Sequence, residues 1–120
     1  LFRSIMVAIA MTNDLKIIME RLTPLFKRRR KTRYWISLVN QTYTPAFNFF
    51  FNIQPKDQRL RSIPLHSLHN YDLAQLELFI GLLRQQTRLT IEFIGFEELR
   101  WPRTNRLIQR RPRADETWPN

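Results

Sequence analysis

Two Arg-rich segments carry the side chains that are best suited to bind another molecule. The first places six cations in seven positions, which are Lys27, Arg28, Arg29, Arg30, Lys31 and Arg33. The second places six arginines in fourteen positions, which are Arg100, Arg103, Arg106, Arg110, Arg111 and Arg113. A guanidinium group is a planar fork that can hold a phosphate through two hydrogen bonds and can stack on a nucleobase. Both segments therefore indicate binding to phosphate groups.

The net positive charge of the chain lies entirely in these two segments. The 120 residues include 20 Lys and Arg and 10 Asp and Glu, a formal net charge of +10. Neither segment contains an acid, so subtracting their twelve cations leaves eight basic and ten acidic residues, a formal −2, in the other 99 positions. Adjacent cations repel one another unless a polyanion neutralises them, which favours a binding surface over the alternative of a solvated face.

The chain lacks the residue sets that most catalytic and cofactor sites require. It has no cysteine for a disulfide or a thiolate metal site, and its two glycines are too few for a Gly-rich phosphate loop. His66 and His69 could share a metal only on a helical turn, with Asp72 as the nearest third ligand. The adjacent Glu97 and Glu98 point apart in a helix or a strand, so they make a poor acid and base pair. We expect no metal, no cofactor and no enzymatic activity.

Hydrophobic periodicity predicts the elements around the first Arg-rich segment. Apolar alternation over residues 4–11 indicates a strand, and a helical period over residues 13–27 follows it, with Pro24 as an expected kink or stop. Residues 34–40 and 47–53 alternate on either side of a turn and predict a hairpin.

The second half of the chain predicts a loop, a helix, a strand and a tail. Residues 54–68 show no clean period, so they are expected to form a long loop that carries Lys56, Arg59 and Arg61. Asn70 is expected to cap a helix that runs to about Leu83, and residues 89–95 are expected to form a last strand. The remaining chain has Pro and Arg but no period that would build a core.

The predicted order of strand, helix, strand, strand, helix and strand indicates an α+β fold. We expect a ferredoxin-like split βαβ sandwich over residues 1–96, with a four-stranded antiparallel sheet and two helices on one face. Residues 97–120 would form a basic C-terminal extension. In this topology the first Arg-rich segment, the 54–68 loop and the start of the extension meet at one edge of the sheet. The expected result is one cationic end that binds a phosphate polymer.

The other face of the predicted sheet offers a second candidate site. Trp35 and Phe50 would point away from the helices and could stack on bases, at about 1–3 kcal/mol per base. The Phe-rich strand over 47–53 is similar to the aromatic strand of RNA recognition motifs. Two features depart from that family: the Lys/Arg-Gly opening is absent, and the expected first strand has Met6 and Ala8 where an aromatic residue is usual. The alternative is that a protein partner or the chain's own tail covers these rings.

These features lead us to expect a structural RNA-binding protein of a ribonucleoprotein, foremost a ribosomal protein of an organelle such as the mitochondrion. Its partners would be rRNA or another structured RNA and neighbouring proteins, with no small-molecule substrate. We expect location in the mitochondrial matrix or another organelle, or else in the cytoplasm, because the Arg-rich chain begins at Leu1 without an initiator Met. No apolar run reaches the ~18 residues of a membrane span. The alternative is an accessory, non-catalytic subunit of an organellar membrane complex that places its arginines on anionic lipids. A DNA-binding regulator ranks last.

Overall fold

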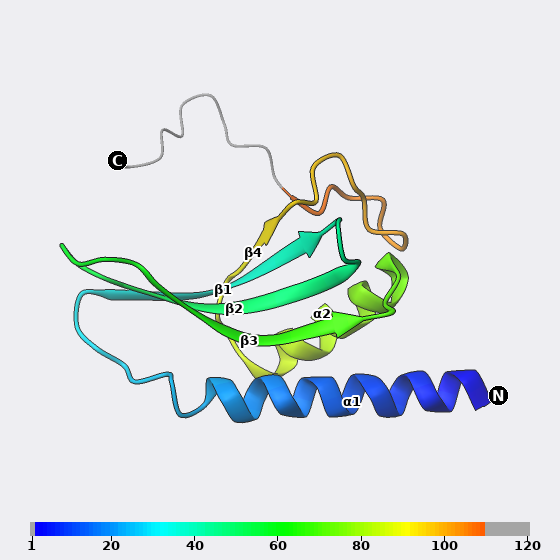
Figure 1. Ribbon diagram of the computed structural model, residues 1–120, viewed down its shortest axis with the longest axis horizontal. Helices are drawn as coiled ribbons and strands as arrows, with labels where there is room; N and C mark the ends of the chain where they lie inside the picture. The colour runs from blue at the N-terminus through cyan, green and yellow to red at the C-terminus, as the bar shows by residue number, and fades with distance from the viewer. Residues whose placement is uncertain (1, 110–120) are drawn as a thin grey trace.

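A computed structural model describes residues 2–109, which form a four-stranded sheet and two long helices (Figure 1). The elements in chain order are α1 (Phe2–Leu22), β1 (Thr32–Gln41), β2 (Ala46–Pro55), β3 (Arg61–His69), α2 (Leu73–Gln86) and β4 (Ile91–Ile94). The strand order is β3-β2-β1-β4, with β1 antiparallel to β2, β2 antiparallel to β3, and β4 parallel to β1. The fold is therefore α+β with a mixed sheet.

The expectation of a fully antiparallel sheet is wrong, and the ferredoxin-like arrangement is not confirmed. That arrangement needs a strand at residues 4–11, and these residues lie in α1 instead. The predicted hairpin thus contains the first strand of the sheet. The chain leaves β3 through α2 and returns beside β1 in the same direction as β1, which makes the sheet mixed.

Helix α1 is apolar at every position from Ile5 to Met11 and amphipathic in its second half. Met11, Ile18 and Leu22 are buried, whereas Ile5 and Ile9 are more than half exposed. Alanine and methionine are strong helix formers, and residues 5–11 are apolar at every position, so the stretch fits a helix at least as well as a strand. The predicted helix over 13–27 is confirmed as far as Leu22, beyond which a turn contains Pro24.

The predicted hairpin is confirmed and forms the centre of the sheet. Ile36 pairs with Phe51 and Leu38 with Phe49, and all four side chains are buried. These side chains face the helices, since the rings of Phe49 and Phe79 of α2 have centroids 5.7 Å apart. Alternation along each strand then sends the intervening residues to the opposite face.

The long loop expected over 54–68 is wrong, because most of it is the end of β2 and the edge strand β3. Pro64 weakens the strand pattern in the sequence. It lies where the pairing of β2 and β3 shifts between Phe49 and Phe50. A bulge on an edge strand tolerates a residue without an N–H group, so the proline does not end β3.

The second helix and last strand are confirmed with small shifts in their bounds. Asp72, rather than Asn70, is the N-cap of α2, because its side chain accepts from the backbone N–H of Gln75 in a capping box. Strand β4 ends at Ile94 and is followed by Gly95, which has a φ of 82°. A Cβ there would lie 2.8 Å from the carbonyl oxygen of Asn40, so glycine is required.

The chain after β4 packs against the helix side of the sheet. Phe96 is fully buried and stacks on Phe47 with ring centroids 5.8 Å apart, and Ile108 is also buried. The backbone N–H of Arg103 donates to Glu77 of α2 over 3.0 Å. The described part of the expected extension thus lies against the core.

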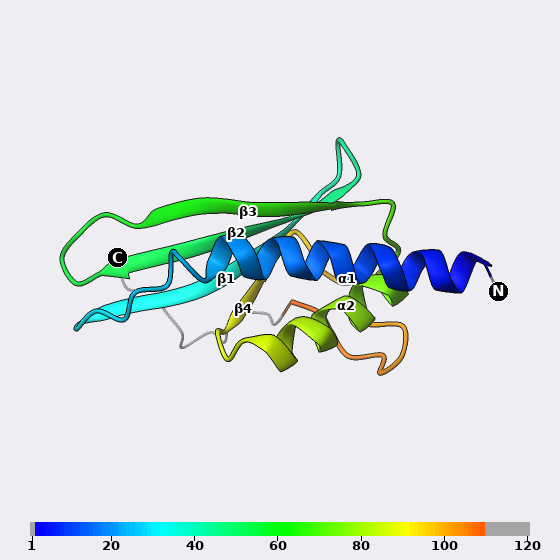
Figure 2. The same ribbon diagram turned by 90° about the horizontal axis from the view of Figure 1, so that it is seen from below.

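Both helices lie on one face of the sheet (Figure 2). The opposite face, turned toward the viewer in Figure 1, carries no described helix. Neither α1 nor α2 has the length and apolar content that a membrane span requires.

Candidate functional site

Two connections that carry cations meet at one end of the sheet. The α1–β1 connection contains most of the first Arg-rich segment, and the β2–β3 turn begins at Lys56. The backbone N–H of Lys56 donates to the carbonyl oxygen of Lys31 over 2.9 Å, which joins them directly. We call the resulting surface the cationic end (at the left in Figure 1); its residues are Lys27, Arg28, Arg29, Arg30, Lys31, Arg33, Lys56, Arg59 and Arg61.

Aromatic packing fixes the α1–β1 connection to the core. Phe26 makes an edge contact with Tyr34 at 4.9 Å between ring centroids, and Tyr34 stacks on Phe51 at 5.8 Å. The Tyr34 hydroxyl donates to the carbonyl oxygen of Lys27. The cations that follow are therefore carried on a backbone anchored at Lys27 and at Lys31.

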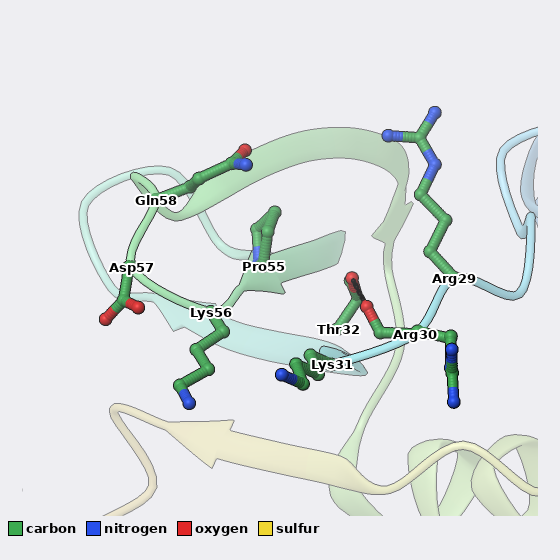
Figure 3. A pocket seen from close by; sticks show the side chains of 8 residues that line it. All are labelled: Arg29, Arg30, Lys31, Thr32, Pro55, Lys56, Asp57 and Gln58. Atoms are coloured by element: carbon green, nitrogen blue, oxygen red, sulfur yellow. Dashed lines mark hydrogen bonds between the residues drawn. The ribbon is translucent and has the colours of Figure 1, made fainter.

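A hollow of about 380 Å³ lies between the two connections, lined by residues 29–32 and 55–58. Figure 3 shows Arg30, Lys31 and Lys56 directed to the same side, with Arg29 directed away from them. Asp57 is the one carboxylate in the lining, and Figure 3 shows it pointing outward from the turn. The hollow thus offers ammonium and guanidinium donors to an anionic group.

The cations of the cationic end form no ion pair within residues 2–109, and Asp57 is the one acid in the connections that carry them. All nine are exposed, and the ion pairs that the structure shows in residues 2–109 are Lys16 with Glu20 and Asp14 with His66. Nine exposed cations without acidic partners repel one another and attract a polyanion.

The described start of the second Arg-rich segment, Arg100 to Arg106, lies at the opposite end of the sheet. The prediction that it meets the other two basic segments is therefore wrong. Because β4 is parallel to β1, Ile94 lies beside Val39, seven residues beyond Thr32. At ~3.3 Å per residue, β4 ends roughly 23 Å from the start of β1. Arg100, Arg103 and Arg106 follow β4 and are exposed; Arg110, Arg111 and Arg113 lie outside the described residues.

Trp35 and Phe50 lie on the uncovered face of the sheet, where both are partly buried. The Arg33 guanidinium carbon lies 5.8 Å from the centroid of the Trp35 ring. The Trp35 Nε1 donor is buried and has no partner among the described residues. Beside the rings, Asn52 donates to the Ser37 hydroxyl over 2.5 Å, and that hydroxyl donates to Glu92 over 3.1 Å.

Asp14, His66 and Tyr71 form a cluster that no pattern in the sequence indicates. The two carboxylate oxygens of Asp14 lie 2.7 Å from His66 Nε2 and 2.8 Å from the Tyr71 hydroxyl, which donates to it. Burial, this hydrogen bond and the charge of Asp14 raise the pKa of Tyr71 well above its usual range. The cluster links α1 to β3 and to the residue before the N-cap of α2, so it stabilises the packing of these elements on one another.

The two histidines are not placed to share a metal. His66 and His69 lie three residues apart in a strand, where such side chains point to opposite faces. No group of three or more potential ligands among His, Asp and Glu gathers within residues 2–109.

No family model, curated protein or solved structure matches this chain. The residues of the chain and their arrangement are therefore the basis for assigning its function.

Proposed function

We propose that this protein is a structural RNA-binding subunit of a ribonucleoprotein, with the cationic end as its main phosphate contact. The observation that carries the proposal is the meeting of nine exposed cations from two connections, without an acidic partner in the described chain. Each phosphate neutralised there would release a condensed counterion and favour binding.

The composition of the cationic end supports a nucleic acid as the polyanion. Six of its nine cations are arginines, whose flat guanidinium groups can both hold phosphates and stack on bases. Arg100, Arg103 and Arg106 at the opposite end would contact a second stretch of the RNA. Two basic ends on one small body suit a protein that holds RNA segments together.

Within this class we place the protein in the ribosome of an organelle such as the mitochondrion. The supporting features are its small size, its Arg-rich and Cys-free composition, and a basic C-terminal region rich in proline. Large RNA assemblies hold such segments in grooves between RNA helices.

The proposal is tested by the salt dependence of RNA binding. Changing Arg28, Arg29 and Arg30 to alanine should lower the affinity for RNA of any sequence by roughly tenfold or more at about 0.1 M salt, because phosphate contacts carry no sequence information. The slope of log K against log salt should flatten by about one unit for each phosphate that the variant no longer binds. Filter binding over a series of salt concentrations measures both quantities.

The matched control changes Lys16, Arg84 and Arg88 to alanine. These are three exposed cations on or next to the helices. It removes the same formal charge, so it should leave the slope nearly unchanged if the position of the cations matters. Equal slopes for the wild type and the Arg28–Arg30 variant would refute the role of the cationic end. Retention on anionic liposomes by a wild-type chain that binds no RNA would favour the membrane-complex alternative instead.

A further inference from the structure

The uncovered sheet face continues directly from the cationic end. Arg33 belongs to the cationic end, and Trp35 is the next residue of β1 on the same face. The arginine lies over the tryptophan ring, so a cation and an aromatic plane are already in contact there. A polymer bound by its phosphates at the cationic end would reach this face without leaving the protein surface.

Trp35 and Phe50 form an aromatic platform on this face. In the register of β1 and β2, Trp35 pairs with Asn52 and Ser37 pairs with Phe50, which makes the two aromatic residues diagonal neighbours. Ser37 and Asn52 are 5% and 4% exposed although no described helix lies over them. The large neighbours Trp35 and Phe50 are the side chains suited to cover this pair.

A second hollow of about 380 Å³ adjoins the platform at the bulge between β2 and β3. Phe50, Asn48 and Ser67 line it from the uncovered face, and Arg21 reaches it from α1 on the helix side, where its guanidinium donates to the Leu65 carbonyl oxygen over 2.5 Å. Ser67 donates to the Asn48 side-chain oxygen over 2.5 Å, which fixes the amide. A flat ring and an oriented amide are groups that can bind the face and the edge of a nucleobase.

Glu92 is the one acid that the described strands place on this face, and it lies beside Ser37, next to the platform. Glu92 lies on β4, where it accepts the Ser37 hydroxyl. Arg33 places a positive charge beside Trp35 through the ring contact. The backbone of a bound strand would therefore lie on the Arg33 side of the platform, next to the cationic end and away from Glu92.

We propose that this face binds unpaired nucleotides, with bases stacked on Trp35 and Phe50 and the backbone held by Arg33 and the adjoining cationic end. The inference rests on the proposed function, since it names the form of RNA that the protein takes. A base must leave its duplex before it can lie flat on an aromatic ring, so the platform selects single-stranded RNA.

The test compares a single-stranded oligonucleotide with an RNA duplex of the same number of phosphates. Changing Trp35 and Phe50 together to leucine keeps apolar side chains but removes both planes. We expect the affinity for the single strand to fall by roughly tenfold or more, because each stacked base is worth about one factor of ten. The affinity for the duplex and the salt slope should stay nearly unchanged.

Two controls separate stacking from folding. Trp35→Phe with Phe50→Tyr keeps both rings and should restore most of the affinity for the single strand. Tyr43→Leu removes an aromatic ring that is 98% exposed in the β1–β2 turn, and it should have no effect. A second measurement uses the full chain with Trp101 and Trp118 changed to phenylalanine, so that Trp35 is the one remaining tryptophan; the single strand should quench its fluorescence.

The outcomes distinguish the two proposals. If the leucine variant binds the single strand as well as the wild type does, or if it unfolds and Trp35 fluorescence does not respond to RNA, the sheet face is not the site. The proposed function would still stand in either case if the Arg28–Arg30 variant loses affinity. If the wild type binds neither RNA, both proposals fail.

Discussion

At the residue scale, Asp14 joins elements that are far apart in the chain. Its two oxygens reach His66 of β3 and Tyr71 before α2, so one carboxylate fixes α1 to both. Hydrogen bonds to a charged group contribute about 1.5–3 kcal/mol when they are well made.

Changing Tyr71 to phenylalanine should remove one of these bonds and keep the ring that contacts Phe79. We expect the free energy of unfolding at pH 7 to fall by about 1–2 kcal/mol, since Asp14 keeps its contact with His66. Urea unfolding followed by circular dichroism measures the change.

The same variant should also alter the response to alkali. The pKa of Tyr71 is raised on folding, so its contribution to stability is complete below the usual tyrosine pKa of about 10 and is lost as the pH rises above that value. The wild type should therefore lose more stability than Tyr71→Phe between about pH 9 and 11, while Tyr43→Phe, at an exposed tyrosine, should behave as the wild type. Identical pH profiles for the wild type and Tyr71→Phe would contradict the assignment.

At the element scale, the central hairpin, α2 and β4 could be predicted because each shows a clear apolar period. Two elements were predicted wrongly because their local pattern is ambiguous. Residues 4–11 are apolar at nearly every position, so no period separates a strand from a helix, and their place in α1 depends on the helix that follows. In β3, Pro64 resembles a strand breaker, although an edge bulge accommodates it.

The candidate site could be predicted only where local properties determine it. The exposure of the cations and the placement of Trp35 and Phe50 follow from charge and alternation, which are local. The position of Arg100, Arg103 and Arg106 depends on the direction of β4 relative to β1, which no local pattern encodes. The cluster around Asp14 depends on packing between α1 and β3, so it could not be predicted from the sequence.

The packing of α1 predicts a strong contrast between two of its isoleucines. Ile18 is fully buried, and its replacement by alanine should lower the free energy of unfolding by about 2–5 kcal/mol. Ile9 is 55% exposed, and the same change there should cost less than about 1 kcal/mol. Denaturant unfolding of both variants checks this; a cost at Ile9 as large as that at Ile18 would mean that residues 4–11 are buried as the sequence pattern suggested.

At the scale of the whole molecule, charge is distributed very unevenly. The cationic end and the group of Arg100, Arg103 and Arg106 lie at opposite ends of the sheet. The chain outside the two Arg-rich segments is close to neutral, and an aromatic face begins at the cationic end. The partner that we propose, a phosphate polymer, would use the basic ends and the aromatic face together.

The most direct measurement is the nucleic acid content of the native particle that contains this chain, with protein–RNA crosslinks mapped to individual residues. The account predicts RNA in the particle and crosslinks within residues 27–33 and 55–61. A particle that holds the chain but no RNA, with these arginines against lipid or carboxylates, would contradict it.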